Sequence, residues 1–263
     1  MSTGGPHILA GHKLNLLRRD RLDPRKAFRI FDDFATVSID DTTTDLTGYA
    51  LDEDAGATAQ MAVSDKRGGW LGITCDGDDN DASCVSTRAE CVIFNGTDEV
   101  FYETVIEHAA GSTDGKSSFA LGISDLATRD LTVDAGTAAT SFDGAVFVKE
   151  EDGNISFVTS NATSQTTTQN VYTWVDGHIV RLGFFYDPND GTTAKITPVV
   201  NGEAVGNTTH DLTISGLAEM HVIVGQVKTH EAAEQELEVD WYEVVQRRNS
   251  AADPGHADFD ATT

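Results

Sequence analysis

Short runs of apolar residues recur along most of the chain, and glycine, asparagine or aspartate separates them. Many of these runs alternate apolar with polar residues or are rich in β-branched side chains, a pattern typical of β-strands. The pattern predicts strands over residues 70–75, 100–107, 119–124, 145–149, 155–159, 179–187, 194–200, 221–227 and 237–246. Apart from a possible helical turn near residues 231–236, the part of the chain that contains these runs has no sustained 3.6-residue period of an α-helix, so we expect an all-β domain.

Two segments between these runs have the composition of tight turns. The sequence DPNDG at residues 187–191 contains a proline that presets one turn dihedral, and Asn201-Gly202 supplies the positive φ that a tight hairpin needs. We therefore expect residues 179–187, residues 194–200 and the chain after residue 202 to form a meander. About a dozen short antiparallel strands in a body of this length are typical of a two-sheet antiparallel β-sandwich or jelly roll.

The charge of the chain is unevenly distributed. The 263 residues include 43 aspartates and glutamates and 18 lysines and arginines, which gives a net charge of −25. Residues 1–30 contain seven basic and two acidic residues, so this segment has a charge of +5 and the remainder −30. We expect a basic N-terminal arm over residues 1–30, a jelly-roll β-sandwich over residues 31–248 and a flexible C-terminal tail over residues 249–263.

The arm combines its basic residues with apolar ones, at Leu14, Leu16, Leu17, Leu22, Phe28, Ile30 and Phe31. Disordered tails contain few leucines, so this composition favours an arm that binds an acidic and partly apolar surface over a solvated tail. Asp23-Pro24 fits an N-cap followed by a proline at the first helical position. The arm is therefore expected to be extended, with a short helix over about residues 24–30.

Composition and missing motifs exclude several classes of function. An acidic body repels phosphate backbones, so we expect no nucleic-acid partner. No window approaches 18 consecutive apolar residues and no apolar segment of a signal peptide is visible, so we expect no membrane partner and no Sec export. The sequence also lacks G-x-S-x-G, Walker and G-x-G-x-x-G motifs, which argues against a hydrolase elbow or a nucleotide site.

Eight segments follow one another in a characteristic order: FDDF (31–34), GGWLGI (68–73), VFYETVIE (100–107), FALGISD (119–125), DGAVFVKEEDGNISFV (143–158), VRLGFFYD (180–187), ITPVVNGEAV (196–205) and LEVDWYEVVQ (237–246). This order resembles the concanavalin A/laminarinase-like jelly-roll domains of virion structural proteins in tailed viruses of bacteria or archaea. The resemblance covers residues 31–247. The resemblance implies a β-sandwich that serves as a capsid decoration or fibre module or that binds glycans. Many members of the family have no catalytic activity.

The strongest enzymatic motif is the sequence from Glu238 to Glu243, which has the E-x-D-x-x-E pattern of laminarinase-like glycosidases. Catalysis would need two carboxylates on one strand face, about 5–5.5 Å apart in a retaining enzyme. Side chains of a strand alternate, so we expect Glu236, Glu238 and Asp240 on one face and Glu243 on the other, unless a bulge lies between Asp240 and Glu243. We therefore expect no catalytic residues and a final strand with Val239 and Trp241 turned to the core. In the enzymes that the chain resembles, the catalytic strand also lies mid-domain rather than at the C-terminal end.

Metal and cysteine chemistry have weaker support. Asp76, Asp78 and Asn80 alternate as calcium ligands do, but Thr87 stands where an EF-hand loop has its glutamate, so a solvated loop is the favoured interpretation. The eight histidines lack ligand spacing, and we expect no metal and no cofactor. Cys75, Cys84 and Cys91 form no C-x-x-C motif; free buried thiols are expected, and one bridge is sterically conceivable. The other two tryptophans, Trp70 and Trp174, lie in apolar runs and are expected in the core.

These observations favour a non-enzymatic structural protein of a virion. We expect it to be a decoration, cement or head-fibre protein that lies on the capsid surface, and we expect the virion to be assembled in the host cytoplasm. The residues expected to anchor it to the major capsid protein are Leu14, Leu17, Arg18, Arg19, Arg21, Arg25 and Phe28. Neighbouring copies of the chain, as a homo-oligomer such as a trimer, would add avidity. Two alternatives stay open: a lectin-like module that binds a host glycan, and a laminarinase-like glycoside hydrolase.

Overall fold

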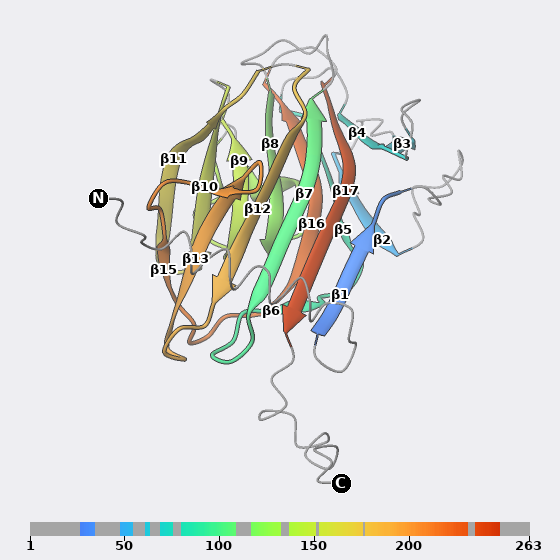
Figure 1. Cartoon of the computed structure of the whole chain (residues 1–263). Helices are drawn as coiled ribbons and strands as arrows, with labels where there is room; N and C mark the ends of the chain where they lie inside the picture. Colours follow the sequence, from blue (N-terminus) through green and yellow to red (C-terminus); the bar gives the residue numbers. More distant parts are fainter. Residues whose placement is uncertain are drawn as a thin grey trace, which may run out of the picture.

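The structure is a computed structural model that describes residues 27–34, 48–54, 61–63, 69–75, 80–108, 117–132, 137–150, 153–175, 177–230 and 235–247. In these ranges the chain forms two antiparallel sheets that face each other (Figure 1). The fold class predicted from the sequence, an all-β sandwich of two antiparallel sheets, is confirmed.

One sheet, called sheet A, has the strand order β14-β13-β12-β7-β17-β4-β3, and in it β1 also pairs with β17 and β15 with β13. Its strands are β1 (Ala27–Asp32), β3 (Met61–Val63), β4 (Leu71–Cys75), β7 (Val100–His108), β12 (Val180–Asp187), β13 (Thr193–Val200), β14 (Glu203–Ala204), β15 (His210–Thr213) and β17 (Gln235–Arg247).

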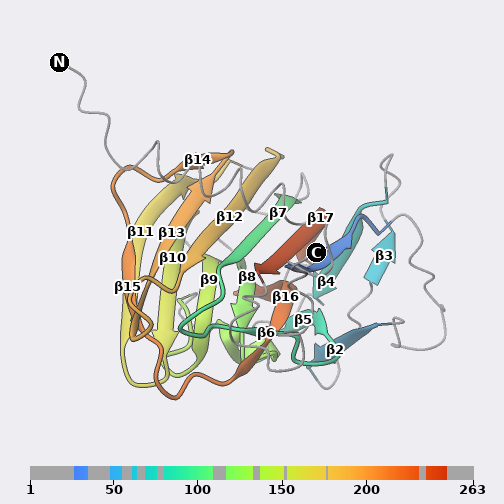
Figure 2. The ribbon, with the colours of Figure 1, turned by 60° about the horizontal axis from the view of Figure 1, so that its bottom comes forward.

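The other sheet, called sheet B, has the order β11-β10-β9-β8-β16-β5-β2, and β6 also pairs with β16. Its strands are β2 (Tyr49–Glu53), β5 (Ala82–Thr87), β6 (Val92–Ile93), β8 (Ser117–Ser124), β9 (Asp143–Lys149), β10 (Asn154–Asn161), β11 (Gln165–Thr173) and β16 (Glu219–Thr229). Figure 2 shows the two layers, with β7 and β17 in one and β8 and β16 in the other.

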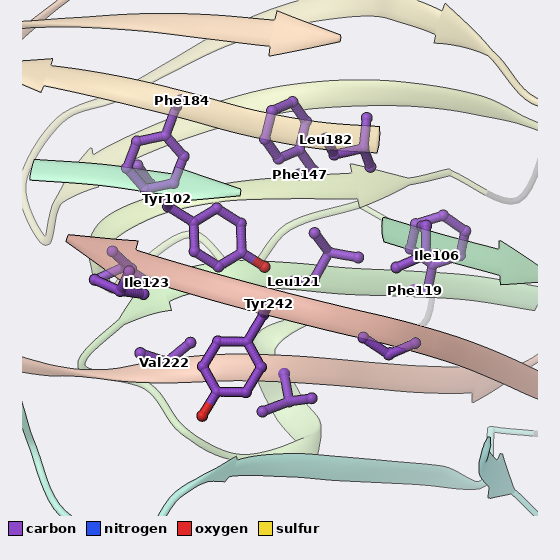
Figure 3. Close-up of a cluster of buried hydrophobic side chains, with 14 of the residues drawn as sticks. Tyr102, Ile106, Phe119, Leu121, Ile123, Phe147, Leu182, Phe184, Val222 and Tyr242 are labelled. Atoms are coloured by element: carbon purple, nitrogen blue, oxygen red, sulfur yellow. The ribbon is translucent and has the colours of Figure 1, made fainter. Parts of the chain in front are cut away.

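Side chains from both sheets fill the space between them, because alternate residues of each strand point inward. Figure 3 shows this core around Tyr102, Phe147, Phe184 and Tyr242. The rings of Tyr102 and Phe184 stack with centroids 5.2 Å apart. Phe157 of sheet B contacts both Phe147 (4.9 Å between centroids) and Phe184 of sheet A (5.8 Å), so aromatic contacts connect the two layers.

The strands predicted from alternation are present, as β4, β7, β8, β9, β10, β12, β13, β16 and β17. The predicted meander is also confirmed, since β12, β13 and β14 are consecutive neighbours in sheet A. Its two turns have the expected backbone: Asn189 and Asn201 both have φ of 51°, and Gly202 has φ of 83°.

The helix predicted over residues 24–30 is wrong where the structure describes it. Ala27–Asp32 is strand β1, which pairs antiparallel with β17 from Ala27↔Arg247 to Asp32↔Tyr242. The Asp-Pro signal is local. In the folded chain the partly buried Phe28 and Ile30 alternate with the exposed Arg29 and Phe31, which is the period of a strand. The free edge of the long strand β17 supplies backbone partners, and tertiary pairing therefore overrides the capping signal.

A β-bulge at Asp240 changes the faces of β17. Val239 pairs with Ile106 and Trp241 with Val105, so Asp240 is the extra residue on β17. After the bulge Tyr242 and Val244 point into the core, while Trp241 lies outside the core cluster, half-buried on the outer face. The expectation that Trp241 faces the core is therefore wrong. Glu243 shares the outer face with Glu238, as expected if this part of the strand is bulged. Trp70 and Trp174 are buried, as expected.

A segment between β8 and β9 covers part of the outer face of sheet B. Within its described residues, Leu131 and Phe142 pack against outward side chains of this sheet, among them Val146 and Ile223. Gln226 of β16 fastens the segment: its side chain accepts a hydrogen bond from the backbone N–H of Thr132 (3.0 Å) and donates one to the carbonyl of Arg129 (2.8 Å). The segment contains a short 3-10 helix, η1 (Arg129–Leu131). Among all the described residues, no helix is long and apolar enough to cross a membrane.

Candidate functional site

Most of the residues predicted as a capsid anchor, from Leu14 to Arg25, lie outside the described residues. Phe28 is the exception, and it is partly buried in β1. Of the calcium candidates, Asp76 and Asp78 also lie outside, while Asn80 has a left-handed backbone (φ 70°) and donates its N–H to the carbonyl of Thr229. Among the described residues no group of three or more histidine, cysteine, aspartate or glutamate side chains could hold a metal ion. Cys75, Cys84 and Cys91 form no disulfide; the first two are buried and Cys91 is partly exposed.

The bulge places Glu238 and Glu243 on the same outer face of sheet A, but it does not bring them together as a catalytic pair. They lie opposite Glu107 and Glu103 on β7, which are four residues apart, so their backbones are separated by about 13 Å. A retaining glycosidase needs carboxylates about 5–5.5 Å apart. Glu243 is also bound to Arg29, whose Nε lies 2.6 Å from its Oε1. This geometry does not suit glycoside hydrolysis.

Ion pairs cross the middle of this face. Glu103 and Glu243 are directly opposite each other on β7 and β17, and both are buried. Arg29 binds Glu243 from β1, and Arg181 binds Glu103 from β12 at 3.3 Å. Two like charges side by side destabilise a sheet, and the flanking arginines offset that repulsion.

Beside this row, two aromatic side chains lie together on the outer face, one exposed and one half-buried. Phe31 of β1 and Trp241 of β17 lie with ring centroids 6.2 Å apart and planes tilted by 38°. Phe31 is 45% exposed, which is unusual for a phenylalanine on a paired strand. The guanidinium carbon of Arg29 lies 4.9 Å from the Phe31 ring centre, so a cation–π contact holds this ring in place.

Two carboxylates lie at the same edge. Asp240 is the bulged residue next to Trp241, and Asp33 follows the end of β1. The pairing of Asp32 with Tyr242 places Asp33 beside this part of β17. Burial raises the pKa of the Asp240 carboxyl, and the negative charge of Asp33 raises it further. We call Phe31, Asp33, Asp240 and Trp241 the aromatic–acidic surface.

This surface combines apolar faces with hydrogen-bond acceptors. Exposed aromatic rings pack against flat apolar faces of a ligand, and carboxylates accept hydrogen bonds from hydroxyl groups. Trp241 and Asp240 stood out in the sequence as part of the E-x-D-x-x-E motif, but no signal in the sequence identified Phe31 and Asp33 as their partners. The FDDF segment gave no such signal, because only the pairing of β1 with β17 brings the two ends of the domain together.

The fold is a concanavalin A-like β-sandwich. Solved structures similar to this chain include a protein of unknown function from Shewanella oneidensis MR-1, with a TM-score of 0.56 and 15% identity over 84% of this chain and 87% of that one. They also include the lectin UEA-II complexed with galactose (TM-score 0.51, 11% identity, 83% and 98% covered). A third is the carbohydrate recognition domain of Emp46p in a metal-free form (0.51, 11%, 81% and 94%).

At these identities the similarity shows the fold alone. No protein-family model matches the chain, and no curated protein matches it either. The descriptions of these three structures mention no virion, so the capsid role, its partners and its location stay predictions from the sequence.

Proposed function

We propose that this protein is a non-enzymatic, lectin-like carbohydrate-binding protein and that the aromatic–acidic surface binds the glycan. The observation on which this rests is the aromatic pair of the exposed Phe31 and the half-buried Trp241, with two carboxylates beside it. The fold supports the proposal, because the similar structures include a lectin bound to galactose and a carbohydrate recognition domain.

Each residue has a distinct role in this proposal. The Phe31 and Trp241 rings pack against the C–H face of a sugar ring and displace water from it. The carboxylates of Asp33 and Asp240 accept hydrogen bonds from sugar hydroxyls, which fixes the orientation of the ring. Arg29 holds Phe31 in position through its contacts with that ring and with Glu243.

The charge of the protein selects among glycans. A net charge of −25 repels sialylated, sulfated and uronic-acid-containing glycans, and the two carboxylates of the surface add to this repulsion locally. We therefore propose a neutral glycan as the ligand.

A panel of neutral and acidic glycans, followed by titration calorimetry of the glycans that bind, tests the proposal. Phe31→Ser and Trp241→Ser are each expected to weaken binding at least about tenfold, which corresponds to about 1.4 kcal/mol. Val175→Ser is the matched control, because Val175 is 44% exposed but lies on the chain between β11 and β12. Equal melting temperatures would show that the variants are folded.

Two outcomes would contradict the proposal. One is that no neutral glycan binds at millimolar concentration. The other is that a bound glycan loses no affinity in Phe31→Ser, in which case the glycan binds at another place on the fold.

A further inference from the structure

The outer face of sheet A has the composition of a covered surface. Four outward apolar side chains, one from each of β1, β7, β12 and β17, form a cluster of their own on this face: Ala27, Phe101, Phe185 and Val245. Each is at most 5% exposed. A sheet with one solvated face carries polar side chains there, whereas a sheet that is covered on both faces is apolar on both.

Acidic residues continue this face beyond the apolar cluster. Glu103 lies directly opposite Glu243, and Glu107 lies directly opposite Glu238. Like charges in directly opposed positions destabilise a sheet. Arg29 and Arg181 bind Glu243 and Glu103, and these four glutamates outnumber the two arginines, so a basic segment bound there would be attracted to this part of the face.

From these observations we propose that the basic arm, residues 1–26, binds the outer face of sheet A of its own chain. The arm is continuous with this face, because β1 begins at Ala27, which is itself a member of the apolar cluster. Its leucines complement Phe101, Phe185 and Val245. Its six basic residues complement the glutamates: Lys13, Arg18, Arg19, Arg21, Arg25 and Lys26.

The length of the arm is sufficient. Twenty-six residues reach at most about 85 Å when extended. Crossing β17, β7, β12 and β13 from β1 takes only about 20 Å at the usual strand spacing. The proposal does not rest on glycan binding, because the apolar cluster that the arm covers lies at the Ala27 end of β1, whereas Phe31 lies toward the other end.

Zero-length carbodiimide cross-linking of the full chain, with mass spectrometry, tests this proposal. The reagent joins a lysine amine to a carboxylate that it contacts, so Lys13 is expected to cross-link to glutamates of the outer face, such as Glu107 or Glu238. The internal control is Lys195, whose Nζ lies 2.7 Å from Oδ1 of Asp211. An equal mixture of ¹⁵N-labelled and unlabelled protein is expected to give only cross-links within one isotope label.

A second measurement, the rate at which trypsin cleaves the arm, does not modify any residue of the sheet. Trypsin cuts after Arg18, Arg19 and Arg21, and the bound arm is expected to be cut slowly. The triple variant Leu14→Ser, Leu16→Ser, Leu17→Ser is expected to be cut at least about tenfold faster. The control Phe259→Ser, near the C-terminal end, is expected to leave the rate unchanged.

Two results would overturn the proposal. If Lys195 cross-links to Asp211 while Lys13 reaches none of the outer glutamates, the arm binds elsewhere. If cross-links join labelled to unlabelled chains, the occupant of the face is the arm of a second copy, and the contact is an interface between copies.

Discussion

His210 makes the stability of the sandwich depend on pH. It lies in β15 of sheet A and is 2% exposed. Its Nδ1 lies 3.0 Å from Oγ1 of Thr159 in β10, and its Nε2 lies 2.8 Å from Oγ1 of Thr168 in β11, so one imidazole ring connects the two sheets. The ring centroid of Phe157 lies 5.1 Å from that of the imidazole, so two hydroxyls and an aromatic ring are among the groups that contact it.

Burial lowers the pKa of His210 from 6.5 to about 4, because the charged imidazolium loses its hydration in this position. The folded-state pKa lies below the unfolded one, so the unfolded chain takes up a proton first as the pH falls. The contribution of the neutral ring to stability is complete above pH 6.5 and is lost as the pH falls from there through 4. At about 1.36 kcal/mol per pKa unit, the loss is about 2 kcal/mol at pH 5 and about 3 kcal/mol at pH 4.

Urea unfolding between pH 7.5 and pH 4 measures this loss. The variant His210→Gln cannot take up the proton, so the difference in unfolding free energy between the natural chain and this variant is expected to shrink by about 3 kcal/mol over the range. The control His178→Gln removes an exposed histidine and is expected to follow the natural chain at every pH. Parallel pH profiles for the natural chain and His210→Gln would refute the reasoning, as would an NMR titration of His210 near pH 6.5.

Two further predictions concern the backbone and the ion pairs. Gly144→Ala is expected to cost more than about 2 kcal/mol in urea unfolding, because Gly144 has φ of +146° and a Cβ would lie 2.1 Å from the carbonyl oxygen of Ile123. Gly206→Ala, where φ is also positive but nothing lies within 4 Å, is expected to cost less; equal costs would show that the close approach is unimportant. Arg29→Met leaves the buried Glu243 without its 2.6 Å partner and is expected to cost about 1–3 kcal/mol in thermal unfolding, while Lys195→Met, in an exposed pair, is expected to change little.

The strands were predictable because each depends on a local pattern. Alternation located β7, β12 and β17 to within a few residues, and Asn201-Gly202 located a turn of the meander. The order of strands was not predictable in this way. β7 pairs with β17 through residues 129 to 146 positions apart, and β8 pairs with β16 through residues 97 to 112 positions apart, and no local pattern contains such contacts.

The two wrong predictions share one physical cause. The helix at residues 24–30 and the inward Trp241 were both derived from local rules, an N-cap signal and a strict period of two. In the folded chain β1 pairs with β17, and β17 is bulged at Asp240 where its partner β7 continues without an insertion. The candidate site depends on both features, since pairing brings Phe31 to β17 and the bulge turns Trp241 outward to meet it.

Glycan binding and arm binding, the two proposals that involve sheet A, are expected to differ in their dependence on salt concentration. A neutral sugar packed on Phe31 and Trp241 is held by burial of apolar surface and by hydrogen bonds, so its affinity is expected to change little with ionic strength. The arm is held partly by charges, and the Debye length falls from about 10 Å at 0.1 M to about 3 Å at 1 M salt. Cross-links of Lys13 are therefore expected to decrease strongly at 1 M salt while glycan affinity persists. A glycan affinity that falls with the cross-links would mean that the arm itself helps to form the glycan site.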